Sequence, residues 1–365
     1  MKKIGLYNPF LDTLGGGEKH ILSIMDALAE LGYEISIFWD KNLNREIRNR
    51  FAIRSVYLWK WSPNIFKHRS IGNRIFRLAS LAQDDLKVTY DYFFYVTDGS
   101  YFFSSAKKNF VFAMVPDKKL YNLNLLNRLK LWNWQFISNS TFTQKWLKKW
   151  GVNSIAIPPY VDDKFFIDKE SKKEKIILSV GRFFPHLHSK NQEKIIETFK
   201  LLKLSNPSFK DYKLILAGGL KKEDEEYFNQ LKSVVRNDSS IIFKTNIPLY
   251  ELYELYKLSN YFWHFTGLGV DENKHPEGVE HFGIAPLEAI ASGCLTFCHS
   301  SGGPKDFVIE GETGFLFDNQ EKLIVKMIAV EKNPLLQKKV KEKGRIIIKN
   351  RFSYQVFKEK VFELL

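Results

Sequence analysis

The sequence predicts an α/β protein with two domains, each built on a parallel sheet that helices cover. Its 365 residues exceed what one hydrophobic core usually serves. Short apolar runs alternate with segments of helical periodicity in both halves, which is typical of parallel sheets. A charged stretch without periodicity, residues 161–175, separates the two series. We therefore expect domains over residues 1–165 and 172–350, and a C-terminal helix over 351–365 that packs back on the first domain.

The N-terminal series opens with a strand, a glycine loop, a helix and a second strand. An apolar run over Ile4–Tyr7 precedes a loop rich in glycine and proline, Pro9–Gly17. Glu18–Leu31 has apolar residues at helical spacing and ends before Gly32, and Glu34–Trp39 is the next predicted strand. The later predicted strands of this half are Ser55–Trp59, Tyr92–Val96, Phe110–Val115, Phe136–Asn139 and Ile155–Ile157.

The same alternation restarts after the charged stretch with a predicted strand over Ile176–Val180. The strands expected after it are Lys213–Ala217, Ile241–Phe243, Tyr261–His264 and Leu295–Cys298. The helices expected between and after them are Glu193–Leu204, Glu223–Val235, Leu249–Leu258 and Ile284–Ser292, with more helix toward the C-terminus. Because open α/β sheets bind ligands beyond the carboxyl ends of their strands, the loops that follow these strands are the candidate sites.

The formal net charge of +14 is concentrated in the N-terminal half. Residues 1–165 contain 24 Lys and Arg against 14 Asp and Glu, whereas the remainder contains 31 against 27. A basic half suits an anionic partner, such as a membrane surface, a phosphorylated lipid or a nucleic acid. It also suits a solvated basic surface without a partner. No nucleic-acid-binding motif occurs, so we expect no nucleic acid partner.

The cysteine count and the N-terminus favour a cytoplasmic protein, free or at the inner face of the membrane. Cys294 and Cys298 are the only cysteines, and they offer neither a plausible disulfide nor a zinc-binding spacing. The N-terminus has no apolar run of signal-peptide length. No run of about 18 apolar residues, the length that spans a bilayer, occurs in the chain.

Three loops have residues suited to binding a phosphorylated ligand. Gly15, Gly16 and Gly17 precede a predicted helix, and glycines allow a phosphate to approach the backbone and the helix N-terminus. A glycine triplet in this place is also typical of a tight turn. Gly181 and Arg182 follow a strand, and Lys190 precedes the next helix. An arginine fork and a lysine ammonium suit a pyrophosphate. The alternative is that Arg182 and Lys190 are two exposed cations near a domain edge that bind no ligand.

The third loop carries two glutamates around a helix start. Glu280 lies in the loop, Gly283 permits a turn, and Glu288 lies on the helix that follows. Backbone groups at Phe282–Ile284 can contact phosphate or sugar oxygens. Glu288 can accept hydrogen bonds from a ribose diol, and Glu280 can hold sugar hydroxyls. The alternative is that each glutamate only stabilises the helix, because the helix dipole favours carboxylates near the N-terminus.

These motifs together resemble the signature of glycosyltransferase family 4, whose members are retaining enzymes of GT-B architecture. Glu280 and Glu288 are separated by seven residues, and SGG at 301–303 and EGETGFL at 310–316 follow them. The resemblance extends over nearly the whole chain, through the glycine loop, NSTFTQKWLKKWGV at 139–152, PPYVD at 158–162 and SVGR at 179–182. It implies two Rossmann-like parallel-sheet domains that face each other across a cleft, with the acceptor in the N-terminal domain and the nucleotide-sugar donor in the C-terminal one.

The resemblance also implies roles for single residues. Arg182 and Lys190 bind the donor diphosphate and steady the leaving group, Glu280 contacts the transferred sugar, and Glu288 holds the ribose. The remaining donor contacts come from Gly16 and Gly17 of the opposite domain and from Gly181, Phe282, Gly283 and Ile284. In this family an acceptor hydroxyl attacks the anomeric carbon from the front face, and a phosphate oxygen takes its proton. Arg182, Lys190 and helix N-termini would supply the positive charge that a metal supplies in other enzymes, and the sequence has no convincing metal-binding D-x-D motif. We therefore expect no metal and no other cofactor.

The acceptor side departs from the family pattern. Many relatives have a histidine shortly before a proline in the N-terminal domain, and Met114 stands at that place here. A methionine neither hydrogen-bonds a sugar hydroxyl nor acts as a base. Asp117 is the nearest polar candidate for that role. Residues 57–78 interleave aromatic side chains with Lys and Arg, which suits an anionic membrane, a lipid-diphosphate acceptor or a helix packed inward.

The GGGE and HSSGGPKDFV segments resemble mannosyltransferases that extend lipid-linked oligosaccharides, and PHLHSKNQ resembles enzymes of bacterial surface-polysaccharide biosynthesis. The expected function is therefore transfer of a hexose to a glycan or lipid-linked glycan, with mannose from GDP-mannose favoured over glucose, N-acetylglucosamine or galactose. The alternatives are a non-catalytic relative, a nucleotide-sugar epimerase of the same architecture, and a basic nucleic-acid-binding or membrane-binding protein.

Overall fold

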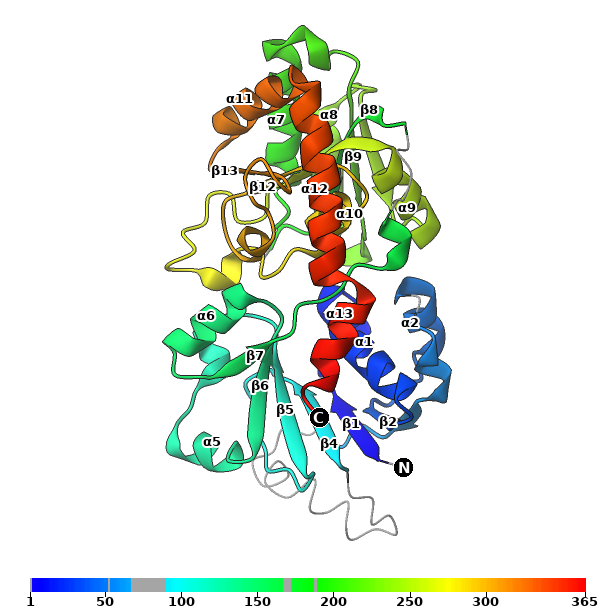
Figure 1. Cartoon of the computed structure of the whole chain (residues 1–365), viewed down its shortest axis with the longest axis vertical. Helices are drawn as coiled ribbons and strands as arrows, with labels where there is room; N and C mark the ends of the chain where they lie inside the picture. Colours follow the sequence, from blue (N-terminus) through cyan, green and yellow to red (C-terminus); the bar gives the residue numbers. More distant parts are fainter. Residues whose placement is uncertain (1, 52, 67–89, 167–171, 187–188) are drawn as a thin grey trace. The chain divides into compact units, whose positions relative to one another are not determined.

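The computed structural model describes the whole chain except residues 1, 52, 67–89, 167–171 and 187–188. It divides into two compact units, one formed by Met1–Pro159 with Phe357–Leu365 and the other by Tyr160–Val356 (Figure 1). The division after Pro159 differs from the boundary at residue 165 drawn from the sequence. Val161 and Phe165 are buried in the core of the C-terminal unit, and the amide of Val161 donates to the Phe352 carbonyl at 2.8 Å.

The N-terminal unit contains a parallel sheet, for which the described residues give seven strands in the order β3-β2-β1-β4-β5-β6-β7. The strands are β1 (Lys3–Tyr7), β2 (Glu34–Phe38), β3 (Lys60–Ser62), β4 (Tyr92–Val96), β5 (Lys108–Ala113), β6 (Trp134–Ser138) and β7 (Ser154–Ala156). The helices are α1 (Gly16–Glu30), α2 (Asn44–Phe51), α5 (Leu125–Lys130) and α6 (Thr141–Lys149), joined by the C-terminal part of α13 (Tyr354–Phe362).

Helices cover both faces of this sheet. From β1 the chain passes through α1 to β2, toward the β3 edge of the sheet. From β5 it passes through α5 and α6 to β6 and β7, toward the opposite edge. Right-handed crossovers therefore place α1 on one face and α5 and α6 on the other (Figure 1). Along β5, Phe112 contacts His20 of α1, whereas its neighbours Val111 and Ala113 join a mainly aromatic core that also contains Leu147 of α6. This alternation is that of a strand buried on both sides.

The C-terminal unit has a second parallel sheet, in the order β10-β9-β8-β11-β12-β13. Its strands are β8 (Glu174–Val180), β9 (Lys213–Gly218), β10 (Ile241–Thr245), β11 (Ser259–His264), β12 (Leu295–His299) and β13 (Phe315–Phe317). Its helices are α7 (Gln192–Ser205), α8 (Glu225–Val235), α9 (Leu249–Leu258), α10 (Ile284–Ala291), α11 (Gln320–Glu331) and α12 (Pro334–Phe352).

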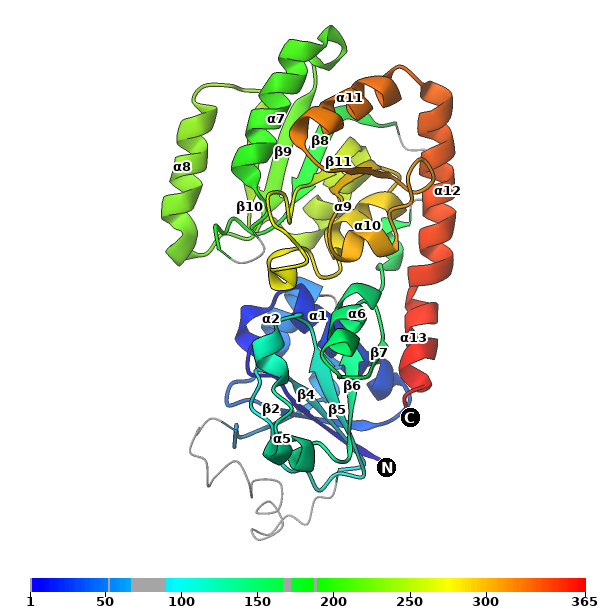
Figure 2. The same cartoon turned by 90° about the vertical axis from the view of Figure 1, so that its left-hand side faces the viewer.

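Two cores lie on the two faces of the C-terminal sheet. Ile177 of β8 packs with apolar residues of α7, α8 and α11. Its neighbours Ile176 and Leu178 pack with residues of α9 and α10 and with the end of α12. Figure 2 shows α7 and α8 on one side of this sheet and α9 and α10 on the other. The predicted α/β class with two parallel sheets is confirmed, and the strands leave their carboxyl ends at one edge, where ligands bind in such folds.

The structure differs from the sequence predictions at several places. Ser55–Trp59 is not a strand: Ser55–Leu58 forms a 3₁₀ turn, because the backbone and hydroxyl of Ser55 both bond to the buried carboxylate of Asp26. The first helix begins at Gly16 instead of Glu18. Strand β13 at Phe315–Phe317 was not predicted, since a run of this length has no clear period. Among the described residues, no helix is long and apolar enough to cross a membrane.

Candidate active site

The loops named from the sequence meet at the carboxyl edge of the C-terminal sheet. Strand β8 is followed by Gly181 and Arg182, β11 ends at His264, and β12 is followed by the Ser301–Gly303 segment. These three strands are neighbours in the order β8-β11-β12, and their pairs are parallel. Their ends therefore lie side by side and bring residues far apart in the sequence into one cluster.

The centre of this cluster is an ion pair between Lys190 and Glu280. The Lys190 Nζ lies 2.7 Å from the Glu280 Oε2, with 23% and 18% of the two side chains exposed. The same Oε2 lies 3.0 Å from the Nε2 of His264, whose side chain is only 3% exposed. One carboxylate oxygen thus receives both an ammonium and an imidazole.

The charge states of the cluster follow from its burial and contacts. Burial raises the pKa of Glu280, but Lys190 and His264 outweigh burial and hold that pKa well below its ordinary value of 4.5. Burial lowers the pKa of His264 more than Glu280 raises it, so His264 is neutral at neutral pH. Because an ionised carboxylate only accepts hydrogen bonds, the neutral imidazole must carry its proton on Nε2 and donate it to Glu280.

Glycines allow the close packing behind Lys190. A Cβ placed on Gly181 would lie 2.5 Å from the Cγ of Lys190, and one on Gly218 would lie 1.9 Å from the Gly181 carbonyl oxygen. Any larger residue at either place would displace the end of β8 or the lysine stem. The stem of Lys190 therefore packs against the end of β8 at Gly181, and its ammonium is held by Glu280.

The Ser301–Gly303 segment supports the loop that carries Glu280. The amide of Gly303 donates to the Glu280 carbonyl at 2.7 Å. Gly302 has a φ of +66°, and a Cβ there would lie 2.0 Å from that same carbonyl oxygen. The amide of Gly302 donates in turn to Glu272 at 2.8 Å, which also pairs with Lys305. The glycines thus fix the backbone of Glu280 as well as permitting a turn.

Glu288 lies on α10 beside tyrosines. It is 7% exposed, and the Tyr256 hydroxyl donates to its Oε2 at 3.3 Å. Burial first, and the charge of Glu288 second, raise the pKa of Tyr256 well above its ordinary value, so the phenol stays protonated as a donor. The helix that carries Glu288 begins after Gly283, which has a φ of 96° and makes no side-chain cap. The amides of Ile284 and the following turn can therefore meet a ligand.

Arg182 is exposed, and its guanidinium carbon lies 4.1 Å from the centre of the Phe184 ring. This stacking leaves the planar guanidinium edges available for a diphosphate. His186 contacts the same ring at 5.1 Å, and His188 lies outside the described residues. Within the described ranges no cluster of three or more His, Cys, Asp or Glu side chains could hold a metal ion.

In the N-terminal unit the glycine loop is the first turn of α1. The Glu18 carboxylate accepts from the Gly15 amide at 2.8 Å and from the Thr13 hydroxyl at 2.5 Å, which caps the helix. A Cβ on Gly17 would lie 2.3 Å from the sulfur of Met114. The structure therefore brings the Met114 side chain against the glycine loop.

Asp117 has a local role in the same unit. Its carboxylate accepts from the Lys119 amide at 2.9 Å and caps the 3₁₀ turn Lys118–Tyr121, called η3. Met114 makes a polar contact through its backbone, since the Asn139 side-chain amide donates to the Met114 carbonyl at 3.0 Å. Contact of Asp117 with an acceptor stays a prediction. Of the aromatic and basic segment 57–78, residues 67–78 lie outside the described residues.

Sequence reasoning missed His264 and Glu272. His264 ends the apolar strand YFWH, and a lone polar residue at the carboxyl end of a buried strand is the signal that could have found it. Glu272 lies in a long polar loop, 30 residues before its partner Gly302, and no local pattern marks it.

Two parallel-sheet units, with cations, a carboxylate and a helix start gathered at the strand ends of the second, match the GT-B class of glycosyltransferases. Residues 161–346 match the model of the family described as glycosyl transferases group 1. The chain belongs to this family.

Curated relatives of the chain are mannosyltransferases. The GDP-Man:Man(3)GlcNAc(2)-PP-Dol alpha-1,2-mannosyltransferase of Mus musculus is 35% identical over 195 residues, which cover 48% of this chain and 36% of the relative. The Homo sapiens enzyme of that name is 34% identical over 232 residues, covering 58% and 44%. These matches thus span less than half the length of either relative. The Schizosaccharomyces pombe alpha-1,3/1,6-mannosyltransferase is 25% identical, covering 88% and 72%.

Solved structures share the fold over the full chain. A glycosyltransferase of Rickettsia africae has a TM-score of 0.74 at 16% identity and covers 100% of this chain and 97% of its own. HepE of Anabaena, solved in complex with UDP and glucose, has a TM-score of 0.71 at 15% identity and covers 100% and 99%. At these identities the likeness establishes the GT-B fold.

Proposed function

We propose that this protein is a retaining, metal-independent glycosyltransferase that moves a hexose from a nucleotide-sugar to a glycan or lipid-linked glycan. The observation that carries the proposal is the Lys190–Glu280–His264 cluster at the strand ends of the C-terminal sheet. Mannose from GDP-mannose is the favoured donor, because the curated relatives are named for GDP-mannose and for a glycan on dolichyl diphosphate. No observation favours the epimerase.

In this proposal the donor diphosphate meets Lys190 and Arg182. Lys190 exchanges its contact with Glu280 for a phosphate oxygen, and Arg182 offers two parallel N–H groups to the other phosphate. Glu280, ionised at neutral pH, then accepts hydrogen bonds from the sugar hydroxyls. The buried carboxylate of Glu288 accepts from the ribose diol, and the backbone at Phe282–Ile284 contacts the sugar and the phosphates.

The transfer step needs no protein base. The acceptor oxygen forms a bond to the anomeric carbon as the bond from that carbon to the diphosphate oxygen breaks. The acceptor proton passes to an oxygen of the departing diphosphate on the same face, so the configuration is retained. Lys190, Arg182 and the amides at the start of α10 stabilise the negative charge that develops on the leaving group.

The acceptor is assigned to the N-terminal unit, whose net positive charge suits a lipid diphosphate at the cytoplasmic side of a membrane. If the acceptor were a glycan without a lipid, the chemistry at the donor site would be unchanged. Peripheral membrane contact is part of this proposal.

The first experiment is a thermal-shift screen of the purified chain against GDP, UDP, ADP and their common sugar conjugates. We expect the nucleotides of one base, guanine in the favoured case, to raise the melting temperature of the wild type. The same nucleotides should leave the melting temperature of Lys190→Ala unchanged. A transfer assay with the matching sugar nucleotide and a pyrophosphate-linked lipid acceptor then identifies the sugar. Absence of a shift with every nucleotide at millimolar concentration would overturn the donor site.

A further inference from the structure

The two cations assigned to the donor diphosphate stand at opposite ends of one loop. Arg182 follows β8, and Lys190 precedes α7. Between Phe183 and Gln192 the described residues belong to no helix or strand, and residues 187–188 lie outside the described part. A loop without regular structure does not by itself fix the spacing of its ends. The contacts at the two ends therefore decide where the cations stand.

The Arg182 end of the loop is held by backbone hydrogen bonds to the end of β9. The Gly181 amide donates to the Ala217 carbonyl and the Phe183 amide donates to the Gly219 carbonyl, both at 2.9 Å. Because these bonds lie on either side of Arg182, they fix its backbone beside β9. Side chains hold the other end of the loop.

Gln192, the first residue of α7, ties that other end to Arg182. Its side-chain Nε2 donates to the Arg182 carbonyl at 3.0 Å, and its Oε1 accepts from the Tyr227 hydroxyl at 3.1 Å. Tyr227 lies on α8, which packs beside α7 (Figure 2). Burial raises the pKa of Tyr227 to about 12, so its hydroxyl stays protonated as a donor. The glutamine is only 2% exposed, and a buried amide is costly unless it is bonded in this way. Gln192 therefore closes the loop at its base.

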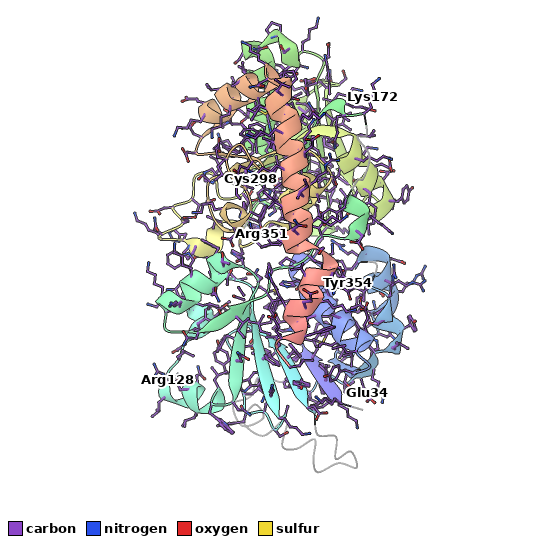
Figure 3. The ribbon with its side chains drawn as sticks, viewed as in Figure 1. Glu34, Arg128, Lys172, Cys298, Arg351 and Tyr354 are labelled. Atoms are coloured by element: carbon purple, nitrogen blue, oxygen red, sulfur yellow. The ribbon has the colours of Figure 1, made fainter. Side chains whose placement is uncertain are left out.

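Asn191 ties the same end of the loop to β11. Its side-chain Nδ2 donates to the carbonyl of Phe265 at 2.8 Å, and Phe265 directly follows His264, the last residue of β11. His264 pairs in turn with Cys298 of β12, a buried residue that Figure 3 labels in this unit. The tether from Asn191 therefore ends at the strand edge that carries the Glu280 cluster.

The conformation of Asn191 shows that its side chain serves this tether instead of the helix. Asn191 is the N-cap of α7, with φ 52° and ψ 41°, and its side chain makes no capping hydrogen bond. An asparagine at an N-cap ordinarily accepts a hydrogen bond from the first helical turn. Glycine and asparagine adopt this left-handed conformation more easily than other residues. The residue thus suits both the backbone and the tether.

We propose that Asn191 and Gln192 are positioning residues that set the spacing between Arg182 and Lys190 for a diphosphate. This role rests on the proposed function, in which both cations meet the donor diphosphate. Neither residue touches the ligand, because Gln192 acts through the Arg182 backbone and Asn191 through the backbone of Lys190 beside it. A diphosphate carries two charged groups at a fixed separation, so the spacing of the cations determines its binding relative to a monophosphate.

The test is titration calorimetry of the purified full chain with two ligands. They are the nucleoside diphosphate that stabilises the wild type in the thermal-shift screen and the monophosphate of the same nucleoside. The wild type should bind the diphosphate more tightly, and the ratio of the two dissociation constants measures the diphosphate preference. Gln192→Met keeps the length of the side chain and removes both of its hydrogen bonds. It should lower the preference about tenfold or more, whereas a general loosening of the fold would weaken both ligands alike.

Thr198→Val is the matched control on the same helix. Thr198 is buried, its hydroxyl donates to the Lys194 carbonyl at 2.6 Å, and it accepts from the Gln320 side chain at 2.8 Å. Removing this hydroxyl also replaces a buried polar group by an apolar one of similar shape. The variant should lose stability in urea unfolding and keep the diphosphate preference of the wild type.

A second variant tests the other tether. Asn191→Gly removes the contact with Phe265 and leaves a residue that suits the left-handed backbone, so it decides the question if Gln192→Met does not fold. It should also lower the diphosphate preference. Its control is Arg236→Gly, at a residue with φ 55° after α8, which should keep the preference. Circular dichroism verifies that each variant is folded.

The outcomes separate this proposal from the proposed function. If the wild type prefers the diphosphate and folded Gln192→Met and Asn191→Gly keep that preference, the positioning roles are refuted and the donor site stands. If the wild type binds neither nucleotide, the donor site fails and these roles fail with it. In Arg182→Met, where no spacing between two cations remains, adding Gln192→Met should weaken diphosphate binding less than it does in the wild type. An equal loss in both backgrounds would show that Gln192 does not act through Arg182.

Discussion

Replacing Lys190 by methionine removes one partner of the central ion pair and nearly preserves the length of the side chain. The ammonium lies 2.7 Å from Glu280, and both side chains are less than a quarter exposed. A hydrogen bond to a charged group contributes about 1.5–3 kcal/mol, and among the described residues the carboxylate left behind keeps His264 as its hydrogen-bond partner. We expect Lys190→Met to lower the free energy of unfolding by about 2–3 kcal/mol.

The matched change is Glu280→Gln, which keeps the shape of the carboxylate and removes its charge. The double variant contains two neutral side chains, so its loss of stability should be smaller than the sum of the single losses by about 1–3 kcal/mol. Equilibrium urea unfolding of the four proteins at neutral pH measures this coupling. A double variant whose loss equals the sum would refute the reasoning.

The coupling depends on pH with a defined sign. Burial raises the pKa of Glu280, but Lys190 and His264 hold it well below 4.5. A carboxyl group with a lowered folded-state pKa stabilises the protein fully above its unfolded pKa and loses that contribution as the pH falls through the folded value. Lys190→Met raises the pKa of Glu280, so the difference from the wild type should shrink in strong acid, where Glu280 is protonated in both proteins.

The same variants distinguish the contacts to the donor diphosphate from the contacts to the donor sugar. Lys190→Met should abolish stabilisation by a nucleoside diphosphate alone, because the ammonium is assigned to the phosphates. Glu280→Gln should keep that stabilisation and lose transfer, because Glu280 is assigned to the sugar. Binding of the diphosphate to Lys190→Met with wild-type affinity would contradict the assignment.

Four further predictions concern single residues or conditions. Glu288→Ala should weaken donor binding, whereas Glu280→Ala should mainly slow transfer, and near-wild-type kinetics in both would remove the ribose and sugar assignments. Gly302→Ala, whose Cβ would lie 2.0 Å from a carbonyl oxygen, should cost about 2–4 kcal/mol in urea unfolding. Gly269→Ala, with a φ of +84° and open space around its Cβ, is its control and should cost only about 1 kcal/mol. Transfer should survive EDTA, and loss of activity restored by manganese would contradict metal independence. Burial lowers the pKa of His20 to about 3. The free energy of unfolding of the wild type should therefore fall relative to that of His20→Phe as the pH drops from 6.5 toward that value, by about 1.4 kcal/mol per pH unit. Parallel curves of unfolding free energy against pH for the two proteins would contradict this.

The sequence predicted most strands and helices because their local signals agree with their surroundings. Leu249–Leu258 has the predicted bounds, and Tyr92–Val96 is the predicted strand. Both are segments whose apolar pattern has a clear period or a continuous run. Ser55–Leu58 failed because its conformation depends on Asp26, 29 residues earlier in the chain. A buried long-range hydrogen bond of this kind leaves no trace in the local pattern.

The candidate site shows the same limit. Lys190 and Glu280 could each be singled out from the sequence, because each stands in a loop with glycines. Their pairing could not, since it follows from the neighbouring positions of β8 and β11 in the sheet. His264 was missed for the same reason: its chemistry arises from the carboxylate that the next loop brings to it.

The cluster has a physical property that single residues do not reveal. Lys190 and Glu280 neutralise each other, and His264 is uncharged, so the group has no net charge. A diphosphate that takes Lys190 away removes the largest influence that lowers the pKa of Glu280 and leaves the carboxyl group with one imidazole partner. Under the proposed function the sugar hydroxyls supply the donors that Glu280 then lacks. The site is therefore complementary to a diphosphate joined to a sugar, in which one ligand provides both the anion that Lys190 accepts and the donors that Glu280 requires.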